Sequence, residues 1–352
     1  MKGYGIIKIG QPGWLDKEKP VPGPLDAIIR PTALAPCSSD THAMHGGSGP
    51  RENLILGHEA IGEVVETGGM VRNFKPGDKV VIPCVTPDWT GRYIQEGKYT
   101  AHDNAAMGSF KFLRAKDGTF AEFFHVNMAD ANMVILPPEI APEAALMTVD
   151  MMSTGFHAVE LAEVRYGETV VIVGIGPVGL MAVAGAQLKG AGRIIVVGTR
   201  LNCVKIAKEY GATDVVSYKD GDIVEQIKSL AGGTVDKVII AGGNAKTLTQ
   251  ALSLVKPTGI VSSVNYYDAS DTFTIPALAW GLGMANIDIR GGFCPGGAVR
   301  IEKLLNIIRY KRVDPTKLIT HRFDGFEKIE DAFLLMDEKP ADLIKPAVFI
   351  KW

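Results

Sequence analysis

The chain has 352 residues, enough for two domains that each bury a hydrophobic core. Charged residues form 22% of it and sum to a formal net charge of −2, which argues against a nucleic-acid partner or attraction to an acidic membrane surface. No uninterrupted apolar run is long enough to cross a bilayer, the N-terminus lacks a signal-peptide pattern, and the four scattered cysteines form no disulfide framework. We therefore expect a cytoplasmic protein with no membrane association.

Residues 1 to about 150 are predicted to be mostly β. Short alternating apolar runs separated by proline and glycine are typical of strands joined by turns. Residues 86–118 follow no regular period and predict a long loop, a kind of segment that often has a function. Over residues 142–162, apolar positions recur every three or four residues and predict a helix. The predicted strands are 26–30, 61–66, 79–82 and 118–126.

Residues 169–200 contain the clearest motif of the chain. A β-branched run at 169–173 is typical of a strand buried on both faces, and a second such run lies at 193–197. Between them a G-x-G-x-x-G sequence opens a small-residue apolar run that predicts a helix. Glycines also mark ordinary turns, but strands on both sides favour a dinucleotide-binding turn. Its residues are Gly174, Ile175, Gly176, Pro177, Val178 and Gly179.

Each glycine of this motif has a physical purpose. Gly174 permits the tight turn, Gly176 lets the backbone approach a pyrophosphate, and Gly179 lets the helix pack on the strand. The free N–H groups and the dipole of the helix N-terminus favour a phosphate there.

The end of the second strand predicts which dinucleotide is bound. NAD sites usually place an acidic residue there for the ribose 2′-hydroxyl, whereas this chain has Gly198, Thr199 and Arg200. The absent carboxylate, the hydroxyl and the guanidinium together favour a 2′-phosphate, and thus NADP(H). A surface turn with a solvated arginine is the alternative.

Strands and helices alternate through the following 70 residues, as in a doubly wound parallel sheet. The glycine-rich stretch 291–297 predicts a hinge or a place of close backbone approach, and a helix follows over 298–310. The last segment, 343–352, is predicted to be a strand that rejoins the first half. The alternating elements are helices at 203–210, 223–230 and 247–255 and strands at 215–216, 237–241 and 260–264.

A second group of polar residues lies in the first half of the chain. Cys37, His42, His58 and Glu59 are of the types that bind zinc. By spacing alone the pattern also fits a buried structural cysteine and satisfied core or surface histidines.

At this point the sequence resembles the zinc-containing medium-chain alcohol dehydrogenases, within them the NADP-dependent secondary-alcohol (isopropanol) dehydrogenases. The resemblance runs end to end. It implies a Rossmann domain at 154–294 and a mostly β, GroES-like catalytic domain formed by 1–153 and 295–352. The stretches that carry it include APCSSDTH (35–42), ILGHEAIGEVVETG (55–68), DMMSTGFHAVELA (150–162), GIGPVGLMAVAGA (174–186) and YKRVDP (310–315).

The resemblance also implies a role for individual residues of the first half. Cys37, His58 and Asp150 match the ligands of the catalytic zinc, and Glu59 matches a residue that can become a fourth ligand. Ser39 matches the hydroxyl that binds the substrate oxygen, and His42 matches the next member of a proton relay. Zinc would act as a Lewis acid on the oxygen while NADP(H) carries the hydride.

Further positions are implied in the cofactor and substrate sites. Tyr218 matches a residue that packs beside the 2′-phosphate, and Asn265, Tyr266 and Lys339 match cofactor or inter-subunit positions, although ordinary loop residues would also explain these three. Phe110 stands where relatives of the subgroup carry tryptophan, and Cys84 where alanine is frequent. A changed pocket wall can alter which side chain of a ketone fits, so the resemblance does not fix the substrate range or the stereochemical preference. The positions expected to line the substrate pocket are Cys84, Val85, Phe110, Phe293 and Cys294.

The expected function is reversible oxidation of small secondary alcohols such as 2-propanol to ketones, by a homotetramer. The four close cysteines that bind a structural zinc in many relatives are missing, which predicts one zinc per subunit. NADP(H) dependence favours ketone reduction. The alternatives are an aldehyde or primary-alcohol reductase, a zinc-free quinone-reductase-like protein, and a zinc hydrolase with an incidental nucleotide fold.

Overall fold

The computed structural model describes residues 1–47, 49–98, 107–268 and 271–352. The chain divides into two compact units: unit 1 comprises Met1–Ser153 and Cys294–Trp352, and unit 2 comprises Thr154–Phe293. The second boundary falls between Phe293 and Cys294, one residue before the expected position. Part of the predicted loop at 86–118 lies outside the described residues.

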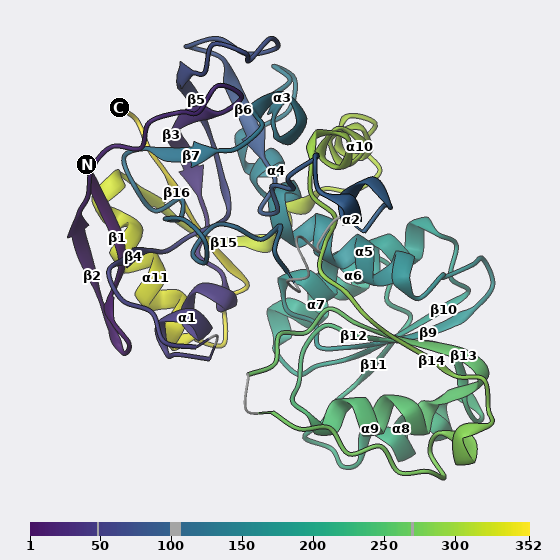
Figure 1. Ribbon diagram of the computed structural model, residues 1–352. Coiled ribbons are helices and arrows are strands. Elements are labelled where there is room, and N and C mark those ends of the chain that lie inside the picture. The colour runs from purple at the N-terminus through teal and green to yellow at the C-terminus, as the bar shows by residue number, and fades with distance from the viewer. Residues whose placement is uncertain (48, 99–106, 269–270) are drawn as a thin grey trace. The chain divides into compact units, whose positions relative to one another are not determined.

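Unit 1 is built on two sheets (Figure 1). The larger has the strand order β15-β16-β3-β5-β6-β8, with β7 paired to β3, and the smaller has the order β2-β1-β4. The last strand of the chain pairs antiparallel with β3 and parallel with β15, which confirms that the C-terminal segment rejoins the first half. The strands are β1 (Lys2–Lys8), β2 (Gln11–Asp16), β3 (Ala27–Leu34), β4 (Leu54–Ile55), β5 (Ala60–Thr67), β6 (Lys79–Ile82), β7 (Phe124–Val126), β8 (Val134–Ile135), β15 (Ile319–Asp324) and β16 (Lys345–Phe349).

The helices of unit 1 are short, apart from two near the C-terminus. Gly296 and Gly297, which precede α10, confirm the predicted close backbone approach: a Cβ on Gly296 would lie 2.1 Å from the Val85 carbonyl oxygen. The helices are α1 (Ser38–Met44), α2 (Arg92–Gln95), α3 (Ala129–Asn132), α4 (Pro142–Leu146), α10 (Ala298–Arg309) and α11 (Ile329–Glu338), with single 3₁₀ turns η3 (Pro315–Leu318) and η4 (Phe326–Lys328).

The prediction of one continuous helix over 142–162 is wrong in one respect. A π-helical turn, η1 (Thr148–Met152), interrupts it after α4, and the helix resumes as α5 (Ser153–Leu161). The Met152 N–H donates to the Met147 carbonyl, five residues back, at 2.9 Å. Such turns insert one residue into the helical ladder and occur often at functional sites. This one carries Asp150.

Unit 2 is a six-stranded parallel sheet in the order β11-β10-β9-β12-β13-β14. Counted along the chain, this is the 3-2-1-4-5-6 order of the Rossmann fold, which confirms the predicted doubly wound sheet. The β-branched runs form its central strands because those strands are covered on both faces. The strands are β9 (Thr169–Val173), β10 (Arg193–Val197), β11 (Asp214–Val216), β12 (Val235–Ile240), β13 (Val255–Ser263) and β14 (Asp288–Gly291).

Helices cover both faces of this sheet (Figure 1). On one face, Ile223 and Ile227 of α8 (Ile223–Ala231) and Leu252 of α9 (Lys246–Leu254) join the strand side chains in one buried core. The helices α6 (Pro177–Leu188) and α7 (Leu201–Glu209) lie on the other face, and a single 3₁₀ turn, η2 (Gly281–Gly283), precedes β14. Among the described residues, no helix is both long and apolar enough to cross a membrane.

Candidate functional site

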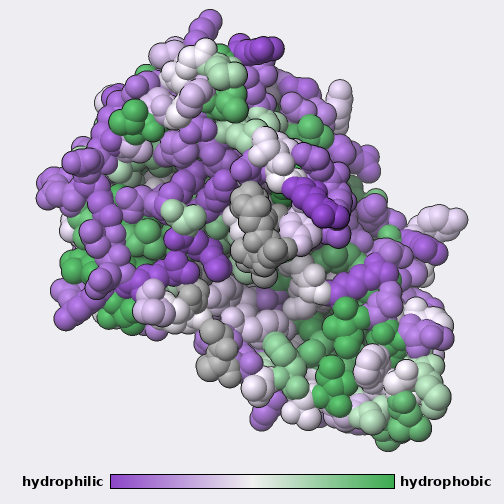
Figure 2. Space-filling model, in the orientation of Figure 1, coloured by the Kyte–Doolittle hydropathy of each residue, from purple (hydrophilic) through white to green (hydrophobic). Residues whose placement is uncertain are grey.

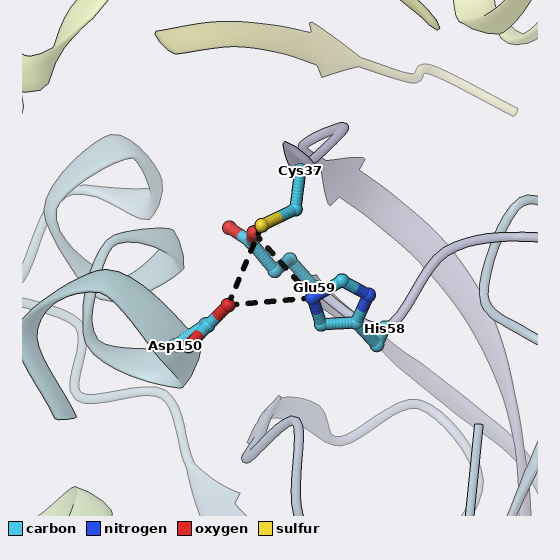
Figure 3. Close-up of side chains that lie close together, drawn as sticks. All are labelled: Cys37, His58, Glu59 and Asp150. Carbon is cyan, nitrogen blue, oxygen red and sulfur yellow. Dashed lines mark hydrogen bonds and ion pairs between the residues drawn. The ribbon is translucent and has the colours of Figure 1, made fainter. Parts of the chain in front are cut away.

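Four side chains from three segments of unit 1 meet at one point (Figure 3). Cys37 precedes α1, His58 and Glu59 precede β5, and Asp150 lies in the π-helical turn. Their potential ligand atoms all lie within 4.8 Å of one another. His58 Nε2 is 3.3 Å from Asp150 Oδ2, and Cys37 Sγ is 3.8 Å from the same oxygen. The structure therefore brings together the four residues predicted as metal ligands.

The cluster has the composition and charge that a divalent cation requires. A thiol, an imidazole and two carboxylates are the ligand types of zinc. Glu59 and Asp150 are buried, and buried carboxylates are costly unless paired or bound to metal. Among the described residues, Glu59 Oε2 has no hydrogen-bond partner although it is buried. This orphaned oxygen and the convergent donors fit a bound zinc ion.

Asp40 orients the cluster, although no role for it was predicted from the sequence. Its fully buried carboxylate accepts hydrogen bonds from His58 Nδ1 at 3.1 Å and from the Cys37 N–H at 2.8 Å. The first bond fixes the ring so that Nε2 faces the other three side chains. Burial lowers the pKa of His58, but Asp40 and Asp150 raise it well above its usual value. An acidic residue three positions after a helix-capping residue is a detectable sequence signal.

Lys345, at the start of β16, is a second missed residue. Its Nζ donates to Glu59 Oε1 at 2.5 Å, and both side chains are at most 1% exposed. Burial raises the pKa of the Glu59 carboxyl to about 7, and Lys345 limits that rise. The two residues are 286 positions apart, so no local pattern in the sequence links them. This ion pair links β16, the C-terminal strand, to the cluster.

Replacing Lys345 with methionine is expected to lower the free energy of unfolding by about 3 kcal/mol, because a buried carboxylate loses its partner. Adding Glu59→Gln should recover most of the loss. Urea unfolding at a fixed metal concentration measures both effects. The matched control is Lys328→Met, which breaks an exposed 2.8 Å pair with Asp331 and should cost less than about 1 kcal/mol. If Lys345→Met and Lys328→Met lowered the free energy of unfolding equally, the pair between Lys345 and Glu59 would not act as a buried ion pair.

Ser39 and His42 lie on α1, which begins directly after Cys37. Ser39 Oγ is 3.3 Å from His58 Nε2, so its hydroxyl faces the cluster. His42 follows three residues later, and residues at this spacing share one side of a helix. Ser39 therefore places a hydroxyl group at the cluster, and His42 places an imidazole ring further along the same helix.

Four of the five predicted pocket residues belong to unit 1. The Phe110 ring stands edge-on to the His58 ring, with centroids 5.2 Å apart. Cys84 and Cys294 place their sulfur atoms 3.5 Å from each other, and both belong to a group that includes Asp150. Val85 is buried beside Cys84. The fifth, Phe293, is the last residue of unit 2.

The glycine turn in unit 2 is closely packed. Gly174 has φ +90°, and a Cβ on it would lie 2.7 Å from the Gly242 backbone. Gly176 is the extended N-cap residue of α6, which Pro177 and Val178 begin. A Cβ on Gly179 would lie 1.8 Å from the Gly174 carbonyl oxygen. The turn thus exposes backbone N–H groups at the N-terminus of α6, where a pyrophosphate can bind.

Gly174→Ala is expected to weaken NADPH binding by at least about tenfold and to destabilise unit 2 by about 2 kcal/mol, because the turn must leave its left-handed conformation. Fluorescence titration and urea unfolding measure the two effects. Gly232→Ala is the matched control, since Gly232 also has a positive φ of +74° but nothing within 4 Å of its Cβ position. The control should cost about 1 kcal/mol and leave NADPH affinity unchanged. Wild-type affinity in Gly174→Ala would refute the assignment.

Of the residues predicted at the 2′-phosphate, Gly198, Thr199 and Arg200 follow β10 and Tyr218 follows β11. Thr199 Oγ1 donates to the Tyr218 hydroxyl oxygen at 2.8 Å, and an Arg200 guanidinium nitrogen lies 3.9 Å from the Cβ position of Gly176. A side chain on Gly198 would meet Ile175 Cγ1 at 2.2 Å, so glycine has a packing reason here as well. The prediction of a 2′-phosphate site therefore rests on Thr199, Arg200 and Tyr218.

The other predicted cofactor residues lie in separate places. Asn265 and Tyr266 follow the carboxyl end of β13, the edge at which parallel sheets bind nucleotides. Asn265 Nδ2 is buried and has no hydrogen-bond partner in the described part of the chain, which fits a missing polar ligand. Lys339 belongs to unit 1, where it ends α11 in a left-handed conformation.

Comparison with known families agrees with this architecture. A family model described as "Zinc-binding dehydrogenase" matches residues 177–308. A second model, "Alcohol dehydrogenase GroES-like domain", matches residues 23–138. A solved structure of zinc-dependent alcohol dehydrogenase 2 from Streptococcus pneumonia, in its apo form, superposes with a TM-score of 0.90 at 29% identity, covering 100% of this chain and 99% of that one. The GroES-like and Rossmann folds are thereby both confirmed.

Two relatives match over their whole length. The NADP-dependent isopropanol dehydrogenase of Thermoanaerobacter brockii is 56% identical, over 99% of this chain and 100% of that protein. The NADP-dependent isopropanol dehydrogenase of Clostridium beijerinckii is 53% identical, with the same coverage. The protein therefore belongs to the zinc-containing medium-chain alcohol dehydrogenase family, in the same subgroup as these two isopropanol dehydrogenases.

Proposed function

We propose that this enzyme reversibly converts small secondary alcohols such as 2-propanol into ketones, with NADP(H) as cofactor and one catalytic zinc per subunit. The observation that carries the proposal is the meeting of Cys37, His58, Glu59 and Asp150 at one point, with a buried, orphaned carboxylate oxygen among them. The names of the two full-length relatives support the substrate and the cofactor. These names favour a secondary alcohol as the substrate of this enzyme over a primary alcohol or an aldehyde.

Each residue of the cluster has a distinct task. Cys37, His58 and Asp150 would hold the zinc, and Glu59, kept in place by Lys345, would be available as a fourth ligand. When bound, zinc supplies Lewis acidity toward the substrate oxygen and NADP(H) supplies or takes the hydride.

Ser39 would receive the alcohol proton and give up its own hydroxyl proton in the same transfer, since its hydroxyl faces the cluster. His42, one helical turn along α1, would pass that proton on towards solvent. Asp40 holds His58 in the tautomer whose Nε2 can act as a ligand. Cys84, Val85, Phe110, Phe293 and Cys294 would define which alcohols fit, with Phe110 packed against His58.

Unit 2 would bind the cofactor. Its pyrophosphate would lie at Gly174, Gly176 and Gly179, at the N-terminus of α6. Thr199, Arg200 and Tyr218 would bind the 2′-phosphate. Asn265, Tyr266 and Lys339 would complete the cofactor site or an inter-subunit contact, and the buried, unpaired amide of Asn265 supports the first role for that residue. NADP(H) dependence favours ketone reduction as the physiological direction.

We further propose that the enzyme is a cytoplasmic homotetramer without a structural zinc. Hydrophobic side chains gather on the face of unit 2 that Figure 2 shows. Unit 2 also exposes Leu278 at 81%, Leu282 at 64% and Met284 at 75%, all within a short stretch of the chain. An apolar patch of this kind usually marks a protein interface. The three residues precede β14, an edge strand of the described sheet. Analytical ultracentrifugation tests the tetramer, and metal analysis tests the zinc count.

The decisive test of the function follows NADPH absorbance with acetone as substrate. Rapid oxidation of NADPH, slow oxidation of NADH, and loss of activity after zinc chelation are expected. Faster turnover of ethanol than of 2-propanol would favour the primary-alcohol alternative. Full activity without zinc would favour a quinone-reductase-like protein, and turnover without NADPH would favour a hydrolase.

A further inference from the structure

Two buried thiols meet beside Asp150, and the catalytic proposal does not use them as ligands. Cys84 follows β6, and Cys294 begins the second segment of unit 1. Their side chains are 0% and 1% exposed, and their sulfur atoms are 3.5 Å apart. Both sulfur atoms and one Asp150 oxygen lie within 4.8 Å of one another. The three form a second group of possible metal ligands.

The spacing of the sulfur atoms suits a shared metal ion. Both cysteines are free, and 3.5 Å is far beyond the length of about 2.05 Å of a disulfide bond. Two thiolates bound to one tetrahedral zinc at about 2.3 Å each lie about 3.8 Å apart. Binding would therefore require the sulfur atoms to separate by only a few tenths of an ångström.

The backbone holds these ligands in place before any metal arrives. The Cys84 N–H donates to the Val149 carbonyl at 3.0 Å, which ties Cys84 to the π-helical turn that carries Asp150. Beyond Cys294, the Pro295 carbonyl accepts from Ser153 Oγ at 3.4 Å, and Arg300 Nε donates to the same hydroxyl at 3.1 Å. A preorganised ligand set loses little conformational freedom on binding.

We propose that Cys84, Cys294 and Asp150 form an inhibitory site for a thiophilic divalent cation, such as Cd²⁺ or excess Zn²⁺. Each cation bound would release two thiol protons to solvent and be held by two thiolates and a carboxylate. Because Asp150 is also a ligand of the proposed catalytic zinc, occupation of this site draws its carboxylate away and lowers activity. The inhibition rests on the proposed function, whereas the uptake of the cation does not.

The test titrates the zinc-loaded enzyme with Cd²⁺ and follows the ultraviolet thiolate-to-cadmium charge-transfer band, the metals bound per chain, and activity. In the wild type we expect one additional cation per chain, retained zinc, a saturating band, and activity that falls in proportion to the added cation. Cys84→Ala and Cys294→Ala should each bind the added cation at least about 100-fold more weakly. Whatever activity each variant has before the titration, that activity should not fall as Cd²⁺ is added. Cys203→Ala, which removes a buried cysteine of unit 2, is the matched control and should behave like the wild type.

Two results would overturn the proposal. One is the absence of an additional bound cation in the wild type. The other is a band and an inhibition that remain in both Cys84→Ala and Cys294→Ala, which would mean that cadmium displaces zinc from the first cluster. The band and the metal count report on this site even if the enzyme proves to act on other substrates.

Discussion

Asp150→Asn is expected to lower kcat/KM for 2-propanol by at least about 1000-fold, together with loss of bound zinc. The asparagine keeps the shape of the side chain but removes the charge that neutralises a divalent cation. Lewis-acid assistance supplies several kcal/mol of transition-state stabilisation, and about 4 kcal/mol corresponds to a factor of about 1000. Steady-state kinetics and metal content after dialysis against a chelator measure the two losses.

Asp150→Cys separates the ligand role from a purely structural one. A thiolate is a good zinc ligand, so this variant should regain zinc and part of the activity. Asp324→Asn is the matched control, because its side chain is 73% exposed on β15 of the same unit, and it should retain zinc and activity. If Asp150→Asn kept its zinc and its turnover, the assignment of Asp150 as a ligand would be wrong.

The fold of unit 2 could be predicted from the sequence because its signals are local. Unbroken β-branched runs, the glycine turn and small-residue helices each specify their own segment, and alternation specifies a parallel sheet. The order of the strands in the structure agrees with this prediction. Unit 1 was predicted less completely, because its strands are short. Its sequence did not indicate the strands β1, β2, β4, β8 and β15 or the helices α1, α2, α3 and α11.

Local sequence patterns indicated only part of the candidate metal cluster. Cys37, His58 and Glu59 were visible as zinc-type residues, but only family resemblance identified Asp150, whose π-helical turn has no clear sequence signature. Lys345 could not be predicted, because its partner Glu59 lies at the other end of the chain. Asp40 could have been found, since it follows Cys37 at the spacing of a capping box.

Arg200→Glu is expected to reduce the preference for NADPH over NADH by about 1000-fold in the ratio of kcat/KM values. A charged hydrogen bond to the 2′-phosphate contributes about 2 kcal/mol, and the new carboxylate adds repulsion of about 1 kcal/mol for each phosphate charge at 4 Å in water. The sum, about 4 kcal/mol, gives the expected factor. NADH lacks this phosphate, so its kcat/KM should change little. Initial rates with both cofactors at fixed acetone measure the ratio.

The controls separate the charge at residue 200 from the charge of unit 2 as a whole. Arg165→Glu makes the same charge change at a side chain that is 75% exposed, and it should leave the cofactor preference unchanged. Thr199→Val removes a neutral hydroxyl that donates to Tyr218, so its effect should be no more than about tenfold. If Arg200→Glu kept its preference for NADPH, the neutral hydroxyls of Thr199 and Tyr218 would have to hold a doubly charged phosphate without a cation. Phosphate sites usually rely on a guanidinium or an ammonium group, so that result would argue against a 2′-phosphate site at the end of β10.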